Sequence, residues 1–254
     1  MPTVDLNADL GEVYGTWSCG DDDAMLSIVS SANVACGMHA GDPEIMARTF
    51  ATAKQKGVAV GAHPGLPDLW GFGRRRIPFT AGEVERLVAY QIGAAQALAS
   101  YAGYRITHVK AHGALGNWSE AERPIADAVA RAIKAVDPGL TYLTIAVSEQ
   151  VKAGEAAGLR TVSEIFADRG YTEKGGLVPR GQPGAMIHDP DEAAERVVAM
   201  VQESALITVS GARISAPVES ICVHGDSAHA VAVAGTVRQR LMDAGLEVAP
   251  FAAN

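Results

Sequence analysis

Carboxylate and amide side chains alternate at the start of the chain. Asp5, Asn7 and Asp9 are spaced two residues apart, and Glu12 follows them. Successive side chains of a β-strand point to opposite sides, so a strand here would direct the three alternating residues to one side. Polar groups on a core strand are costly without partners, and carboxylates can orient or deprotonate water. We therefore predict that Asn7 and Glu12 contact substrate or phosphate and that Asp9 is catalytic.

Histidines recur beside glycines at corresponding places along the chain. His39, His63, His112 and His224 each follow a short apolar run and precede a helix-like stretch. An imidazole titrates near neutral pH, glycine lets the backbone approach a ligand, and a helix N-terminus favours negative charge. We predict that His63, His112 and His224 are catalytic and that His39 contacts substrate or phosphate.

Charged residues accompany the histidines. Lys110 alternates with His108 and His112, and a lysine that faces a protein interior is costly unless it meets an acid or an anion. We predict that Lys110 and Glu164 are catalytic. The other residues predicted to contact substrate or phosphate are Asp42, Arg74, Arg75, Asp168, Arg169 and Asp226. The basic run 74–76 fits a solvated loop and an anion clamp equally well.

The elements that must position these residues alternate along the sequence. Candidate strands are the β-branched runs 3–7, 32–36, 58–62, 106–110, 140–145, 161–166, 206–209, 220–224 and 246–251. Candidate helices, with apolar residues at three- and four-residue spacing, are 21–29, 43–56, 80–102, 119–135, 148–157, 190–204 and 227–244. This order predicts right-handed βαβ units and a parallel sheet. We expect one α/β domain over 1–254, a TIM-barrel-like fold of about seven to eight units with its chemistry at the C-terminal ends of the strands.

Composition excludes several classes of protein. The 254 residues are 48% hydrophobic, and the net charge of -8 is spread along the chain, so we expect no nucleic-acid partner. The chain shows neither a signal peptide nor an apolar stretch that could span a bilayer, so we expect a cytoplasmic protein without a membrane partner. The scattered cysteines Cys19, Cys36 and Cys222 argue against disulfides and a cysteine-based zinc site.

Several standard motifs are absent. No GxxxxGK[ST] run is present, so a nucleotide would be held otherwise than by a P-loop. No HExxH or CxxC run is present either, and we assign no metal ligand. A metal site assembled from His and Asp residues of separate strands stays an alternative.

Motifs over nearly the whole chain resemble those of a known family. From residue 4 to about residue 230 the chain reads, in order, DLNADLGE, NVACGMHAGDP, GAHPGLPDLWGFGRR, VKAHGALGN, EIFADRGY, LVPRG and ICVHGD. Together these are similar to the LamB/YcsF family. The resemblance implies a deformed β/α barrel and ATP-dependent cleavage of 5-oxoproline to L-glutamate, in a complex with 5-oxoprolinase subunits B and C. It also implies ATP as a co-substrate, with Mg²⁺, and no tightly bound organic cofactor.

Two stretches depart from the family pattern. KPHGALYN is usual where this chain carries Ala111 and Gly116, and SPHA is usual where it carries Ala228. The titratable residues are retained. As a hypothesis, Lys110 and an arginine stabilise phosphate or the substrate carboxylate, Asp9 or Glu164 activates water, and the histidines carry protons.

Two other functions stay open. One is a stand-alone metal-dependent hydrolase of the carbohydrate deacetylase type, with an ion bound by some of Asp9, His39, His63 and His112. The other is a non-catalytic component that binds substrate for its partners, because polar strand ends serve binding as well as catalysis.

Overall fold

Parallel strands close into a barrel in the computed structural model, which describes residues 2–17, 19–224 and 228–252. The strands that form the barrel are β1 (Thr3–Leu10), β2 (Ser31–Ala35), β3 (Ala59–His63), β4 (Ile106–Val109), β5 (Thr141–Ile145), β6 (Thr161–Phe166) and β9 (Ser220–Val223). Each pairs with the next in this order, and β1 pairs with β9 to close the ring. The prediction of a TIM-barrel-like α/β fold is confirmed, with seven strands in the barrel.

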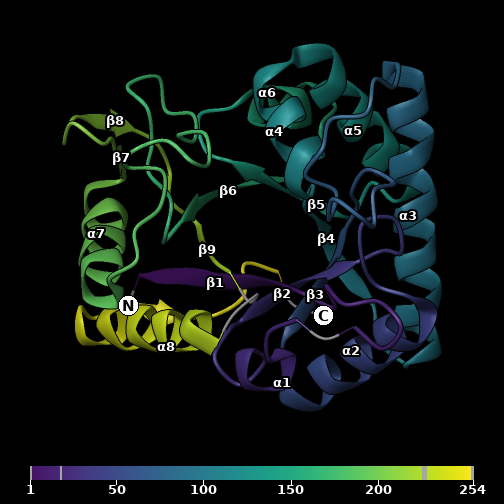
Figure 1. Ribbon diagram of the computed structural model, residues 1–254, viewed down its shortest axis with the longest axis horizontal. Coiled ribbons are helices and arrows are strands. Elements are labelled where there is room, and N and C mark those ends of the chain that lie inside the picture. The colour runs from purple at the N-terminus through teal and green to yellow at the C-terminus, as the bar shows by residue number, and fades with distance from the viewer. Residues whose placement is uncertain (1, 18, 225–227, 253–254) are drawn as a thin grey trace.

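Helices cover the outside of the strands (Figure 1). They are α1 (Asp22–Met25), α2 (Pro43–Lys56), α3 (Ala81–Tyr101), α4 (Gly113–Ala121), α5 (Arg123–Val136), α6 (Glu149–Ala156), α7 (Pro190–Glu203) and α8 (Ala228–Asp243). Local caps begin several of them. Asp42 accepts hydrogen bonds from the amides of Glu44 and Ile45 at the start of α2, and Thr80 and Glu83 form a capping box at α3.

The predicted helix 119–135 is two helices in the structure. Glu122 lies between α4 and α5 with an extended backbone, φ -116° and ψ 110°. Pro124 follows in the first turn of α5. A proline has no amide hydrogen and clashes with the preceding turn, so one helix cannot run through this position. The break lets α4 begin directly after His112, which is its N-cap residue.

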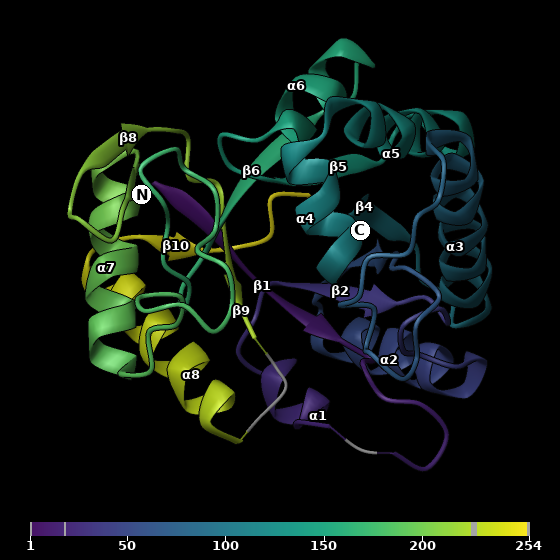
Figure 2. The same ribbon diagram turned by 45° about the horizontal axis from the view of Figure 1, so that its top comes forward.

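The predicted strand 206–209 is not part of the barrel. It forms β7 (Ala205–Ile207), which pairs antiparallel with β8 (Arg213–Ser215), a strand that the sequence did not reveal. The predicted strand 246–251 is reduced to β10 (Glu247–Val248), which pairs with the first residues of β1 outside the ring. Figure 2 shows the β8 end of the hairpin beside α7, away from the strands of the barrel.

The strands bury both of their faces, one apolar and one polar. In β1, Leu6, Ala8 and Leu10 are fully buried and belong to the apolar core under the helices. Asp5 and Asn7 alternate with them and are equally buried, but their partners lie on other strands of the barrel. The barrel interior is therefore polar along β1, as the alternation predicted. No helix among the described residues is long and apolar enough to cross a membrane.

Candidate active site

Lys110 lies at the centre of a buried charge network at the C-terminal end of the barrel. Its Nζ is 3.0 Å from Asp9 Oδ1 and 3.1 Å from Glu164 Oε2. It also donates to Asn7 Oδ1 at 3.3 Å and contacts Cys222 Sγ at 3.0 Å. Two carboxylates thus surround one ammonium group, and they come from β1 and β6 while the lysine follows β4. The predicted residues Asn7, Asp9, Lys110 and Glu164 form one cluster.

The two carboxyl groups on Lys110 differ in acidity. Burial raises the pKa of Asp9, but attraction to His63 and Lys110 outweighs it and holds that pKa well below the usual range. Burial raises the pKa of Glu164, and Lys110 only partly offsets the increase. Burial lowers the pKa of Lys110, but its acidic neighbours carry it well above the ordinary value. The network therefore holds an ionised Asp9–Lys110 pair beside a carboxyl group that can keep a proton more readily.

A chain of hydrogen bonds from neighbouring strands holds this charge network in place. Asn33 donates through Nδ2 to Asn7 Oδ1 at 2.8 Å and to Asp9 Oδ1 at 2.9 Å. Its Oδ1 faces His108 Nε2 at 2.9 Å, and His108 Nδ1 faces Thr107 Oγ1 at 2.9 Å. Because the amide nitrogen of Asn33 donates to Asn7 and Asp9, the side-chain oxygen of Asn33 must accept, and His108 must carry the proton on Nε2. Burial, together with the charge of Lys110, lowers the pKa of His108 to about 3.

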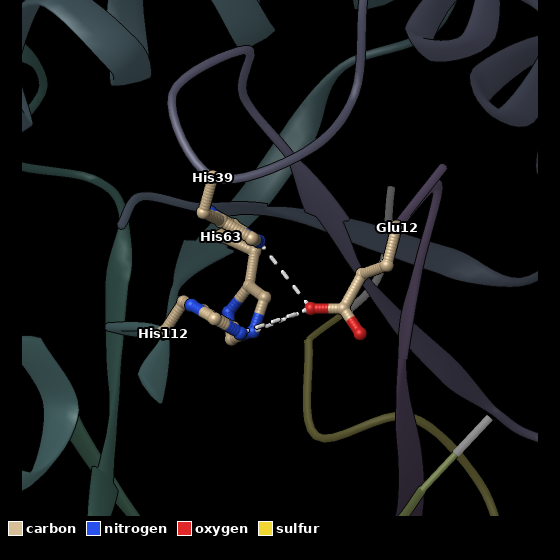
Figure 3. A group of neighbouring side chains, drawn as sticks. All are labelled: Glu12, His39, His63 and His112. Carbon is tan, nitrogen blue, oxygen red and sulfur yellow. Dashed lines mark hydrogen bonds and ion pairs between the residues drawn. The ribbon is translucent and has the colours of Figure 1, made fainter. Parts of the chain in front are cut away.

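Three histidines surround the carboxylate of Glu12 at the mouth of the barrel (Figure 3). Glu12 Oε1 is 3.3 Å from His39 Nε2, 3.3 Å from His112 Nε2 and 3.8 Å from His63 Nε2. The histidines are almost fully buried, whereas the Glu12 side chain is 13% exposed. Glu12, His39, His63 and His112, which were predicted separately, therefore lie together, and His63 joins them to the Lys110 cluster because its Nε2 is 3.2 Å from Asp9 Oδ2.

The imidazole rings have fixed orientations. Those of His39 and His112 stack with centroids 3.6 Å apart and planes 1° from parallel, and the ring of Phe72 meets both edge to face. His63 Nδ1 is 2.8 Å from the carbonyl oxygen of Lys110, so this nitrogen donates and Nε2 faces the carboxylates. Burial lowers the pKa of His39 and of His112. For His63 burial also lowers the pKa, but attraction to Asp9 raises it overall.

Hydrogen bonds within the protein hold the loop that follows β1. The loop that carries Glu12 is attached through the amides of Gly11 and Gly15, which donate to Asp22 and Asp42 at 2.9 Å and 2.8 Å. Asp42 therefore caps α2 and anchors this loop, both within the protein. The predicted contact of Asp42 with substrate would have to compete with these bonds.

A third group forms around His224. Its Nδ1 is 2.6 Å from Asp168 Oδ2, and its Nε2 is 3.3 Å from Arg180 Nη2. The imidazole ring of His224 stacks on the ring of Phe166, with centroids 6.1 Å apart. Lys110 Nζ lies 5.3 Å from the centre of the Phe166 ring. Phe166 thus lies between the His224 pair and the lysine network. Burial raises the pKa of Asp168, but the bond to His224 outweighs it and lowers the pKa overall.

The predicted arginines lie in different surroundings. Arg75 pairs with Asp68 through both Nε and Nη2. Arg169 donates to the carbonyl oxygens of Ala185 and Val178, so it braces the loop that follows β6. Arg74 stacks on Phe72 at 5.0 Å, and its charge contributes to the low pKa of His112. Of the three predicted arginines, Arg74 is therefore the one whose charge acts on His112, and Asp226 lies outside the described residues.

Several buried residues of the site were not among the predicted ones, and Asn33, Cys222 and Gln91 are examples. Asn33 and Cys222 alternate along their strands with residues of the apolar core under the helices, which was a usable signal. Gln91 lies on the buried face of α3, three residues after Val88, and its side-chain amide pairs with both the N–H and the C=O of Gly65 at 2.9 Å and 3.0 Å. Gln91 thereby fixes the loop that passes the histidines.

This arrangement can support acid–base chemistry on an anionic substrate. It offers a buried ammonium, one ionised carboxylate, one carboxyl group of raised pKa and histidines that face the carboxylates. The convergent nitrogens of three histidines and the oxygen of Glu12 are also of the kinds that hold metal ions.

Comparisons with known proteins agree with this architecture. Residues 4–254 match the model of the LamB/YcsF family. A protein from Azorhizobium caulinodans, named as the A subunit of 5-oxoprolinase, is 64% identical over 252 residues, which cover 99% of this chain and 100% of that protein. The crystal structure of a lactam utilization protein from Thermus thermophilus superposes with a TM-score of 0.93 at 44% identity, over 98% of this chain and 100% of that one.

A more distant structure shares the fold alone. The catalytic domain of a peptidoglycan N-acetylglucosamine deacetylase from Eubacterium rectale ATCC 33656 superposes with a TM-score of 0.53 at 10% identity, over 98% of this chain and 88% of that chain.

Proposed function

This chain belongs to the LamB/YcsF family, and we propose that it is the A subunit of an ATP-dependent 5-oxoprolinase, a hydrolase that opens a cyclic amide. The names of its relatives support the reaction, since proteins 64% and 57% identical are both named as the A subunit of 5-oxoprolinase. The observation that carries the proposal to individual residues is the position of Lys110 between Asp9 and Glu164, beside His63.

The reaction needs activation because a lactam amide is a poor electrophile. Transfer of the γ-phosphoryl group of ATP to the lactam oxygen releases ADP and makes the ring carbon reactive. Water then adds to that carbon, and the ring nitrogen leaves as the amine with a proton. The γ-glutamyl phosphate that remains is hydrolysed by a second water to glutamate and phosphate. The chain must therefore stabilise negative charge and move protons.

The charge network supplies both functions in this proposal. Lys110 stabilises the phosphoryl oxygens or the substrate carboxylate. The carbonyl group of Lys110 holds His63 in position beside Asp9, and Asp9, which stays ionised, orients the attacking water. Glu164, whose pKa burial raises, delivers a proton to the departing nitrogen. Asn7 positions both Lys110 and Glu164 through its amide.

The remaining predicted residues take supporting roles. His112 and His39 line the mouth with Glu12, and Arg74 beside them contacts the anionic end of substrate or nucleotide. The pair of His224 and Asp168 relays protons on the other side of Phe166. Arg75 and Arg169 act by bracing their loops.

We propose that ATP acts as co-substrate with Mg²⁺ and that subunits B and C are the partners of this chain. The relatives are named as one lettered subunit of an enzyme, which supports a multi-subunit assembly. The test is coexpression with the neighbouring gene products and measurement of glutamate formed from 5-oxoproline. We expect glutamate to form only when both ATP and this chain are present. If the partners alone form glutamate at the same rate, this chain has no part in the reaction. If the Lys110→Met chain supports full turnover, the catalytic proposal fails and a binding role replaces it.

A second candidate function is metal-dependent hydrolysis by the chain alone, as in carbohydrate deacetylases. The cluster of Glu12 with three histidines favours it. This alternative predicts release of acetate from N-acetylated sugars by the isolated chain, abolished by chelation of protein-bound metal. An isolated chain without this activity, whether metal-loaded or not, eliminates the alternative.

A further inference from the structure

The ligand atoms of Glu12, His39, His63 and His112 converge in a way that the lactam reaction does not require. The three histidine nitrogens and one carboxylate oxygen all lie within 4.8 Å of one another. His39 lies in the loop after β2, His63 ends β3 and His112 precedes α4, and in Figure 3 their rings turn the same kind of atom, Nε2, toward one oxygen of Glu12. We propose that these four residues bind one divalent transition-metal ion, with Zn²⁺ as the ion that this donor set fits best.

The distances match those between neighbouring ligands of such an ion. Zinc binds imidazole nitrogen and carboxylate oxygen at about 2.0–2.1 Å, which places neighbouring ligands of a tetrahedral site about 3.3 Å apart. Glu12 Oε1 is 3.3 Å from His39 Nε2 and from His112 Nε2, and 3.8 Å from His63 Nε2. Coordination of one ion at the centre of the four atoms also requires the rings of His39 and His112, whose planes are 1° from parallel, to tilt toward each other.

His63 is prepared as a ligand by its other nitrogen. Its Nδ1 donates to the carbonyl oxygen of Lys110 at 2.8 Å, which leaves the lone pair of the neutral ring on Nε2. Metal-binding histidines are held in the same way by a hydrogen bond from the second nitrogen. The Nε2 atom faces the carboxylates of Glu12 and Asp9, whose negative charge a proton or a metal ion at this position would offset.

The two stacked rings are held in place by close-packed backbone. A Cβ added at Gly65 would lie 2.4 Å from His39 Nδ1, and one at Gly73 would lie 2.8 Å from His112 Nδ1. The backbone at these glycines therefore limits how far the two rings can move away from Glu12. Ligands positioned by packing before an ion arrives bind it with less loss of entropy.

The donor set decides the class of ion. Three imidazoles with one carboxylate suit zinc and its neighbours in the first transition row. Mg²⁺ and Ca²⁺ prefer oxygen ligands, which this cluster offers only through Glu12 and the adjacent Asp9. The site therefore differs from one for Mg²⁺ carried by a nucleotide. The proposal differs from our sequence-based assignment of no metal ligand, which relied on motifs within single elements.

The test measures metal directly on the full chain without an affinity tag, because a polyhistidine tag would bind the same ions. Protein stripped with chelator is equilibrated with Zn²⁺, and bound metal is counted by mass spectrometry. Co²⁺ is then used as a spectroscopic probe, since its visible absorption reports the ligands around it. The variants are Glu12→Gln and His112→Gln, with His188→Gln as the matched control, a histidine exposed outside the cluster.

We expect one zinc ion per chain in the unchanged protein and in His188→Gln. Binding should weaken at least about 10-fold in Glu12→Gln and more in His112→Gln, with an altered Co²⁺ spectrum. Circular dichroism shows whether His112→Gln folds. If it does not, the zinc affinity of Glu12→Gln, a change at the partly exposed mouth of the barrel, tests the proposal. Substoichiometric zinc in the unchanged chain, or a Glu12→Gln chain with wild-type affinity and spectrum, overturns the proposal. Neither ATP nor 5-oxoproline is present, so the result is independent of the proposed reaction.

Discussion

Lys110 Nζ lies 3.0 Å from Asp9 Oδ1 inside the barrel, an ion pair between residues 101 positions apart in the sequence. The lysine side chain is 4% exposed, so its charge depends on the protein for solvation. Asp9 and Glu164 provide two carboxyl groups for one ammonium, and their pKa values shift in opposite directions. The same contacts therefore determine both the stability of the barrel interior and the chemistry that it offers.

The change Lys110→Met should destabilise the protein and inactivate it. It leaves Asp9 and Glu164 buried without their cation, and loss of one partner of a buried pair costs about 3–5 kcal/mol. Turnover in the complex should fall about 10²-fold or more, because a charge that stabilises anionic intermediates is gone. Urea unfolding and ATP-dependent glutamate formation measure the two effects.

Lys152→Met is the matched control for this change. Lys152 pairs with Glu149 at the surface, where an ion pair contributes less than about 1 kcal/mol. If the two variants unfold at the same urea concentration, the buried pair does not stabilise the fold as we infer.

His108 should stay neutral across the physiological range, with its proton on Nε2. Burial lowers its pKa to about 3, and its two nitrogens are engaged by Asn33 and Thr107. Imidazole ¹⁵N resonances, assigned with a His108→Gln chain, should show the Nε2–H tautomer and no change between about pH 5 and pH 8. A titration of His108 within that interval would contradict the hydrogen-bond chain through Asn33.

The effect of Asp5→Asn on stability should depend on pH. Burial raises the pKa of Asp5 from 3.8 to about 6, even though hydroxyl groups of Ser30, Ser31 and Ser220 donate to it. The folded state therefore holds this proton to higher pH than the unfolded state. Stability contributed by the protonated form is fully present below about pH 4 and is lost as pH rises through about 6.

Asparagine does not titrate, so the stability of the variant relative to the unchanged chain should rise between about pH 4 and pH 7. The rise should reach about 3 kcal/mol, from a shift of roughly two pKa units at about 1.4 kcal/mol each. Urea unfolding of both proteins at a series of pH values measures the difference. A difference that stays constant over this interval would show that Asp5 titrates as in the unfolded chain.

Gly65→Ala should disturb the histidines without unfolding the barrel. The new Cβ would lie 2.4 Å from His39 Nδ1 and 3.2 Å from His112 Nδ1, so the stacked rings must shift. A displacement of about 1 Å in a catalytic site can cost about 10²-fold in rate, and we expect a loss of this order in glutamate formation. Far-UV circular dichroism should be unchanged.

Gly93→Ala serves as the control, because an added Cβ at this exposed position of α3 meets no atom within 4 Å. Alanine favours a helix over glycine by about 1 kcal/mol, so this variant should be fully active and at least as stable. Equal activity of the two variants would mean that the histidine positions do not matter for turnover.

Sequence patterns predicted the barrel well where the signal was local. The helix 43–56 was predicted at its observed bounds because a cap, a proline and a regular apolar spacing mark it. The strand 161–166 was also predicted at its observed bounds, from its β-branched residues. The hairpin of β7 and β8 was missed since three-residue strands carry little periodicity. The helix over 119–135 was predicted as one element because the apolar spacing continues through Pro124.

The sequence by itself determined which residues could meet, and the tertiary structure decided which of them do. Alternation along β1 directed Asn7 and Asp9 inward, and recurring glycines marked His39, His63 and His112 as strand-end residues. Nothing local distinguished Arg74, which lies beside the histidines, from Arg75, which pairs with Asp68. The grouping of Glu12 with three histidines required closure of the barrel, because register between distant strands depends on packing of the whole ring and leaves no trace in any one segment.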